Sequence, residues 1–178
     1  VAWVIPVLVL SGLTGCVPDE GGSSSKKVHA TAFLRHGAKW TTHTLMSGKL
    51  SDADRADRIG TTAKDGYKTI YVYAANEKDY GGQSVMYAPA AKDSWRKWLK
   101  KCSEAGLAVV LWMRADDSPG LDGWSDAKWE AFYKDVTAGV DDLVSEYVIG
   151  LEVNEYWSAS RTAKLIGVLR KYTKKFDG

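Results

Sequence analysis

An apolar, β-branched or aromatic segment recurs about every forty residues. This regular spacing constrains the fold of the chain more than any other feature of the sequence. Each segment is nearly continuous in hydrophobicity, as expected for a strand of a parallel sheet that is covered on both faces. A polar stretch and then a helical pattern follow each one. The predicted strands are VHATAFL (28–34), KTIYVYAA (68–75), LAVVLWM (107–113) and YVIGLEV (147–153).

The segments between the strands have the periodicity of amphipathic helices. Ser51 and Ser125 are suited to cap two of these helices, and Gly66 and Gly106 are suited to end two of them. We expect the apolar faces to pack in the core. They consist of Ala53, Ala56, Ile59 and Ala63; of Trp95, Trp98, Leu99 and Cys102; of Trp129, Phe132, Tyr133, Val136, Val140, Leu143 and Val144; and of Leu165, Val168, Leu169 and Tyr172.

Strands that alternate with helices predict an α/β fold with a parallel sheet built from right-handed βαβ units. Two architectures fit this pattern. One consists of parallel (βα)4 units like the first half of a (β/α)8 barrel, and the other is an open doubly wound sheet. In both architectures the functional face lies at the carboxyl ends of the strands, so we expect a binding site there.

Residues 1–15 have the composition of a secretory leader, because they carry no charge and their apolar run is too short to span a bilayer comfortably. Their last three residues and Cys16 form LTGC (13–16), which resembles the lipobox of bacterial lipoproteins. The resemblance implies cleavage before Cys16, acylation of that cysteine, and an extracytoplasmic protein that is membrane-anchored or secreted. The alternative is a buried apolar segment with a free cysteine. The Gly- and Ser-rich residues that follow predict a flexible tether over 16–27 and a folded domain over 28–178.

Composition and motif spacing exclude several function classes. The formal net charge is +2 and no basic stripe is present, so no nucleic-acid partner is predicted. His29, His36 and His43 form no metal-binding motif with one another or with cysteine, and we expect no metal and no cofactor. The stretch DDSPGLDG (116–123) lacks the spacing of a calcium-binding loop and predicts a turn. An acylated Cys16 would leave Cys102 without a disulfide partner, as a small core residue.

The segments after the four predicted strands are 35–49, 76–89, 114–124 and 154–157. Three of them are longer and more polar and aromatic than a simple connection needs. Because the carboxyl ends of parallel strands share one edge of a sheet, we expect these segments to form the site together.

The fourth predicted strand ends in VIGLEVNEYW, with Asn154-Glu155 at its carboxyl end. This sequence resembles the fourth-strand signature of clan A glycoside hydrolases, the barrel enzymes that include the family 5 cellulases. The resemblance implies that Glu155 is the general acid/base of a retaining mechanism and that Asn154 binds the sugar 2-hydroxyl. If strand alternation continues to the end, Glu152 and Glu155 point to opposite faces, and the family match selects Glu155.

The same resemblance implies a polysaccharide as the partner of the site. Aromatic loop residues are expected to stack on sugar rings, and polar residues at the same end are expected to contact the sugar. The predicted contact residues other than Asn154 are Tyr156, Trp157, Trp124, Tyr80, Tyr87, His36, Arg114 and Asp116.

A retaining glycosidase needs a second carboxylate, and in clan A the seventh strand carries it. We therefore expect the domain over 28–178 to be an incomplete barrel with its nucleophile outside this chain. The chain would be a truncated product, a half barrel that self-associates to cover its open sheet edges, or a half that kept only a binding role. Two function hypotheses result: a glycoside hydrolase-like protein, and a non-catalytic surface lipoprotein that binds glycans or a partner protein.

Overall fold

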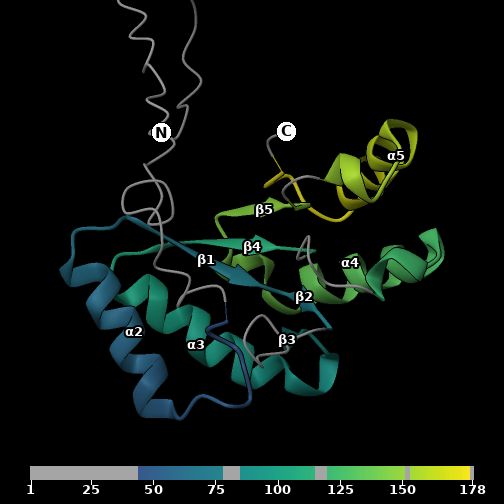
Figure 1. Cartoon of the computed structure of the whole chain (residues 1–178). Coiled ribbons are helices and arrows are strands. Elements are labelled where there is room, and N and C mark those ends of the chain that lie inside the picture. The colour runs from purple at the N-terminus through teal and green to yellow at the C-terminus, as the bar shows by residue number, and fades with distance from the viewer. Residues whose placement is uncertain (1–43, 78–84, 115–119, 151–152, 177–178) are drawn as a thin grey trace, which may run out of the picture.

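The computed structural model describes residues 44–77, 85–114, 120–150 and 153–176 (Figure 1). The predicted leader, the tether and the first predicted strand (28–34) lie outside these residues. No helix within the described ranges is long and apolar enough to cross a membrane.

Three parallel strands form the central sheet in the order β1-β4-β5. They are β1 (Thr69–Tyr73), β4 (Ala108–Trp112) and β5 (Glu146–Val148). Each strand pairs with the strand of the next βα unit, and the order of the described strands does not reverse as it does in a doubly wound sheet. This part of the chain is therefore a parallel α/β structure in the strand order of a barrel.

A short antiparallel hairpin extends the sheet beyond the carboxyl end of β1 (Figure 1). It consists of β2 (Ala75–Asn76) and β3 (Val85–Met86). The predicted strand over 68–75 is thus divided into two pieces, and its end is raised toward the loops at that edge of the sheet.

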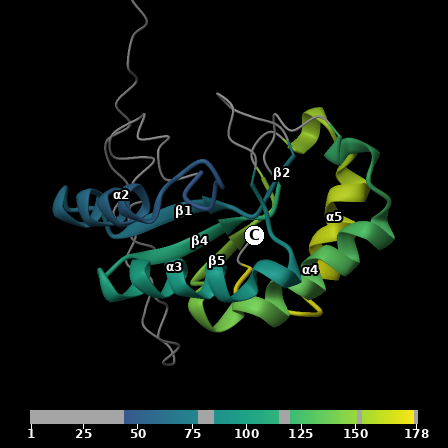
Figure 2. The same ribbon diagram turned by 90° about the horizontal axis from the view of Figure 1, so that it is seen from below.

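The described residues form four α-helices, the first before β1 and the others between or after the strands: α2 (Asp52–Lys64), α3 (Lys92–Glu104), α4 (Asp126–Val140) and α5 (Ala159–Leu169). Ser51 caps α2 in a capping box, and Ser125 caps α4, as predicted. Gly66 and Gly106 follow α2 and α3 with φ of 84° and 77°, a conformation that favours glycine. Figure 2 shows the helices in chain order, from α2 and α3 on one side to α4 and α5 on the other.

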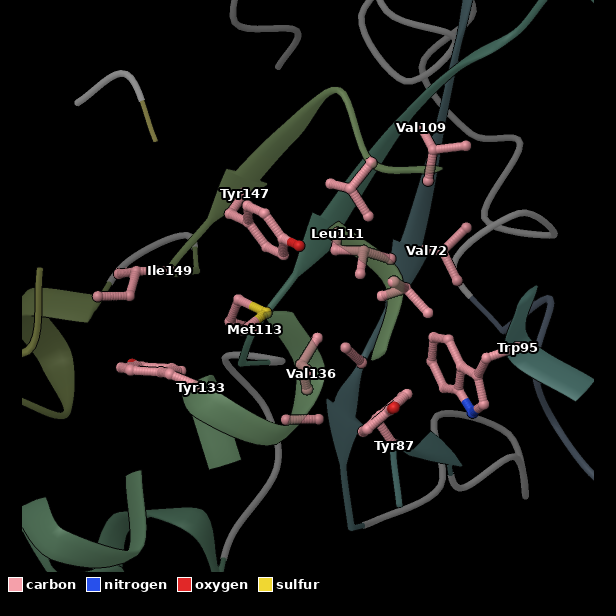
Figure 3. Close-up of a cluster of buried hydrophobic side chains, with 14 of the residues drawn as sticks. Val72, Tyr87, Trp95, Val109, Leu111, Met113, Tyr133, Val136, Tyr147 and Ile149 are labelled. Atoms are coloured by element: carbon pink, nitrogen blue, oxygen red, sulfur yellow. The ribbon is translucent and has the colours of Figure 1, made fainter. Parts of the chain in front are cut away.

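The helices cover one face of the sheet and form the main core with it. Figure 3 shows Val72 and Leu111 of the sheet among side chains of the helices, including Trp95 and Val136. Most residues of the apolar faces predicted for α3, α4 and α5 are buried here, whereas Leu143 and Tyr172 lie beyond the ends of α4 and α5 and are only partly buried. The buried residues of these helices include Trp95, Trp98, Leu99, Cys102, Trp129, Phe132, Tyr133, Val136, Val140, Leu165, Val168 and Leu169.

The predicted face of α2 was wrong in part, because Ala53 and Ala56 are exposed while Ile59 and Thr62 are buried. Hydrogen bonds of Arg55 explain this orientation of α2: its side chain donates to the carbonyl oxygens of Leu45 and Ser47 in the preceding loop. Alanine contributes too little apolar area to outweigh these contacts.

The opposite face of the sheet carries a second apolar cluster that includes Tyr73, Val110 and Trp112. The Trp112 ring lies 5.1 Å from the Tyr71 ring and 5.2 Å from the Tyr73 ring, centroid to centroid. Aromatic side chains therefore line this face toward the carboxyl ends of β1 and β4.

The fourth predicted strand is shorter than expected. Strand β5 ends at Val148, Gly150 has a φ of 147°, and Val153–Glu155 forms the 3-10 turn η5. After α5 the chain returns to the outer edge of β5, where the amide of Tyr147 donates to the carbonyl oxygen of Lys175 at 3.1 Å. The segment around Lys175 thus occupies the place of the next parallel strand.

Candidate functional site

Three segments meet at the carboxyl-end edge of the sheet, which we call the rim. They are Asn76-Glu77 at the end of β2, Arg114 after β4, and η5 with Tyr156 and Trp157 after β5. The 3-10 turn η3 (Leu121–Gly123) joins them through side-chain contacts described below. The sequence predicted this edge as the functional face because parallel strands place their carboxyl ends together.

Glu155 is an exposed residue at the end of η5. The carbonyl oxygen of Val153 accepts hydrogen bonds from the amides of Tyr156, at 3.1 Å, and Trp157, at 2.7 Å. Glu155 therefore lies on a turn that follows the strand, not on the strand itself. The backbone of Asn154 belongs to the same turn, and the roles predicted for both residues stay predictions.

Tyr156 and Trp157 point into different environments although they are neighbours in sequence. Tyr156 is 36% exposed and is the one large exposed apolar side chain among the described residues. Trp157 is 3% exposed and packs edge-on against Trp129 of α4, with the ring centroids 5.3 Å apart. Tyr156 can therefore offer a ring face to a ligand, whereas Trp157 anchors the turn to the core.

The side chain of Arg114 is completely buried beneath this aromatic pair. Its Cζ lies 4.6 Å from the ring centroid of Tyr156 and 5.0 Å from that of Trp157. Its Nη2 forms an ion pair with Asp122 of η3, whose side chain is half-exposed. Its Nε and Nη1 have no hydrogen-bond partner among the described residues. The guanidinium contacts Tyr156, Trp157 and Asp122, and the substrate-binding role predicted for Arg114 stays a prediction.

A second arginine, Arg161 at the start of α5, ties the other side of the rim together. Its Nε donates to Asp126 of α4 at 3.2 Å, and its Nη2 donates to the carbonyl oxygen of Trp124. Its Cζ also lies 5.3 Å from the centroid of the Trp157 ring. The ends of α4 and α5 are thus held against the turn that carries Glu155.

Two groups near the rim have pKa values shifted in opposite directions, Asp126 by hydrogen bonds from cationic side chains and Tyr133 by burial. Hydrogen bonds from Lys164 first, and also from Arg161, lower the pKa of Asp126. Burial raises the pKa of Tyr133, while the charges of Arg114 and Arg161 oppose that rise. Tyr133 is therefore a neutral core phenol at physiological pH.

Two further predicted stacking residues are packing residues in the structure. The Tyr87 ring is buried, edge-on to Trp95 at a centroid distance of 5.4 Å. The Trp124 ring lies between Trp129, at a centroid distance of 4.8 Å, and Lys128, whose Nζ is 3.8 Å from its centroid. Trp157 is buried as these two rings are, and the stacking role predicted for the three residues stays a prediction. The other predicted site residues, His36, Tyr80, Asp116 and Cys16, lie outside the described residues.

The contacts at the rim between the segment after β2 and the segment after β4 were not predicted from the sequence. The Glu77 carboxylate lies against Gly120, where a Cβ would come within 2.6 Å of Glu77 Oε2, and Gly120 has a φ of 105°. Asp122 of the same turn pairs with Arg114. The Pro-Gly dipeptide in DDSPGLDG was the one sequence signal for these contacts. It predicts a turn that reverses the chain and brings Asp122 back toward the end of the preceding strand.

The described residues contain no group of three or more His, Cys, Asp or Glu side chains that could hold a metal ion. The described part of the rim presents the exposed residue Glu155 next in sequence to the exposed ring of Tyr156. Such a pair suits a ligand with hydroxyl groups and an apolar face.

No protein-family model matches the chain, and the search of curated proteins found no match. Three solved structures resemble part of it. The β-glycosidase BGL167 is 24% identical, with 53% of this chain and 24% of that chain covered and a TM-score of 0.41. A GH113 β-1,4-mannanase is 14% identical, with 74% of this chain and 48% of that chain covered and a TM-score of 0.45.

The β-glucosidase 1317 is 15% identical, with 66% of this chain and 32% of that chain covered and a TM-score of 0.42. The chain spans less than half the length of each of these proteins. These similarities are to parts of larger proteins, and membership of a family does not follow from them.

Proposed function

We propose that this chain is a glycoside hydrolase-like protein that acts on or binds a polysaccharide at the rim. The observation that carries the proposal is the position of Glu155: it is an exposed carboxyl group at the carboxyl-end edge of a parallel sheet, directly followed by the exposed ring of Tyr156. An aromatic ring beside a carboxyl group suits a sugar, whose C–H face packs on the ring while its oxygens reach the carboxyl.

In the proposed reaction Glu155 protonates the glycosidic oxygen of the leaving sugar and later removes a proton from water. Asn154, by its match to the family motif, binds the sugar 2-hydroxyl. A retaining mechanism needs a second carboxylate at about 5 Å as the nucleophile. In this proposal the nucleophilic carboxylate is supplied from outside this chain.

The test uses the full chain and a panel of soluble β-1,4-mannan, cellohexaose, xylohexaose and laminarihexaose. Binding is measured by isothermal titration calorimetry and hydrolysis by the release of reducing ends. Where the wild-type protein releases reducing ends, which requires the second carboxylate to be supplied, Glu155→Gln is expected to lower hydrolysis about 100-fold or more with little change in affinity, because the amide keeps the shape but cannot donate and accept the proton.

Glu104→Gln is the matched control. Glu104 is an exposed glutamate at the end of α3, at the opposite edge of the sheet from the rim, and its Oε1 is 3.7 Å from Lys100 Nζ. This variant should behave as the wild type. Sugar release that survives Glu155→Gln would overturn the role of Glu155.

The second candidate function is glycan binding without hydrolysis. It is favoured by the exposed Tyr156 ring, which serves as a binding platform whatever the chemistry beside it. Wild-type protein that binds a member of the panel without releasing reducing ends would support this candidate. Absence of binding to every member would count against both candidates.

A further inference from the structure

We propose that Arg114 is a positioning residue of the rim, whose guanidinium holds the Tyr156 ring, and with it the turn that carries Glu155, in place for a sugar ring to stack on. The inference rests on the proposed carbohydrate function, because it assigns a sugar to the exposed face of Tyr156. It differs from a substrate-binding role, since the Arg114 side chain is 0% exposed and does not reach solvent.

The guanidinium lies where it can fix two rings at once. Its Cζ is 4.6 Å from the centroid of Tyr156 and 5.0 Å from that of Trp157, both within the range of cation–π attraction. This attraction is stronger for a desolvated cation than for an exposed one. One face of the Tyr156 ring is therefore held from below while the ring stays partly exposed.

The remaining contacts of Arg114 indicate that it does more than stabilise the fold. Its Nη2 pairs with Asp122, while Nε and Nη1 have no hydrogen-bond partner among the described residues. A buried ion pair is a weak source of stability. Because the Asp122 side chain is half-exposed, water can solvate its carboxylate when an apolar side chain replaces Arg114. What an apolar side chain cannot supply is the attraction that orients Tyr156.

The orientation of Tyr156 is coupled to Glu155 through the backbone. The carbonyl oxygen of Val153, the first residue of η5, accepts hydrogen bonds from the amides of both Tyr156 and Trp157. Trp157 is in turn fixed by Trp129 and by the packing of α4. A change beneath the Tyr156 ring therefore reaches the turn that carries the carboxyl group.

The experiment compares Arg114→Met and Arg114→Lys with the wild type in the full chain. A single 3-fluorotyrosine is placed at position 156, and its fluorine resonance reports on the ring independently of any sugar. Thermal unfolding and affinity for the sugar panel are measured on the same variants. Arg96→Met is the matched control, because Arg96 also forms a bidentate pair with a carboxylate, Asp142, but lies away from the rim.

In Arg114→Met the fluorine resonance is expected to move toward its position in unfolded protein, while the melting temperature stays within a few degrees of the wild type. Sugar affinity is expected to fall about 3- to 30-fold, which corresponds to the loss of one cation–π contact. Arg114→Lys should change the fluorine resonance and the sugar affinity in the same direction but by less than Arg114→Met, because an ammonium group keeps the charge but cannot lie flat against a ring. Arg96→Met should leave the resonance and the affinity unchanged.

A wild-type fluorine resonance in Arg114→Met would overturn the inference, even if the protein binds sugar. If Arg114→Met does not fold, Arg114→Lys decides: wild-type resonance and affinity in that variant overturn the inference. If the wild type binds no sugar in the panel, the proposed function fails, and the fluorine resonance still shows whether Arg114 orients Tyr156. The two failures are therefore distinguishable.

Discussion

Burial of the Cys102 thiol makes the stability of the fold depend on pH in the alkaline range. Cys102 lies on the buried face of α3, and burial raises the pKa of its thiol to about 12. Between the pKa of an unfolded thiol, about 8.5, and that value, the unfolded chain loses a proton that the folded chain keeps. The unfolded state then binds fewer protons, so the free energy of unfolding falls as the pH rises.

Cys102→Ala removes this dependence. Above pH 9 the free energy of unfolding of the wild type should fall more steeply than that of Cys102→Ala, by about 1 kcal/mol per pH unit. Urea unfolding at pH 8, 9 and 10 measures the difference, and the tyrosines and lysines that titrate in this range are common to both proteins. If the free energy of unfolding has the same pH dependence in the wild type and in Cys102→Ala, the thiol ionises as readily in the folded chain as in the unfolded one.

At the scale of elements, two helical glycines predict opposite outcomes of the same substitution. A Cβ on Gly139 of α4 would lie 2.7 Å from Cζ of the buried Tyr87, whereas a Cβ on Gly167 of α5 would meet nothing within 4 Å. Gly139→Ala should destabilise the fold by about 1–3 kcal/mol through overpacking. Gly167→Ala should stabilise it by about 0.5–1 kcal/mol, because alanine favours the helix.

Urea unfolding of both glycine variants checks this pair of predictions. Gly139→Ala combined with Tyr87→Phe should recover part of the lost stability, because the hydroxyl nearest to the new methyl group is gone. A Gly139→Ala variant as stable as the wild type would show that the Tyr87 ring does not pack against α4 at Gly139.

The elements themselves were largely predictable because they depend on local pattern. The spacing of Trp95, Trp98 and Cys102 predicted the buried face of α3, and Ser125 predicted the start of α4. The end of β5 was not predicted, since an apolar run continues past Gly150 whereas the backbone there leaves the strand. Hydrophobicity gives the extent of burial, and backbone geometry decides where pairing stops.

The candidate site was predictable only in its outline. Parallel strand order placed Asn154-Glu155 at the functional edge, and the sequence named both Tyr156 and Arg114. It did not predict that Arg114 lies beneath Tyr156, nor that Tyr87 and Trp124 are buried. The position of Arg114 depends on its contacts with Asp122 of η3 and with Tyr156, which lie far apart in the chain. The burial of Tyr87 and Trp124 depends on their packing against Trp95 and Trp129 of the helices.

For the whole molecule, the strongest untested prediction concerns the residues before the folded domain. The LTGC sequence predicts that Cys16 is acylated and anchors an extracytoplasmic protein. A single acyl chain gives weak, reversible binding, so stable anchoring requires the additional chains that lipoprotein processing adds. The Gly- and Ser-rich residues up to 27 would then let the rim reach a polysaccharide away from the membrane.

The chain offers its own control for this prediction, because it has two cysteines in different settings. Cys102 is buried in the core, where a fatty acyl chain has no room. Expressed in a bacterium from a start codon placed before Val1, the wild type and Cys102→Ala should incorporate a clickable palmitate analogue and sediment with membranes. Cys16→Ser should do neither, and label in that variant would show that the lipid is attached elsewhere.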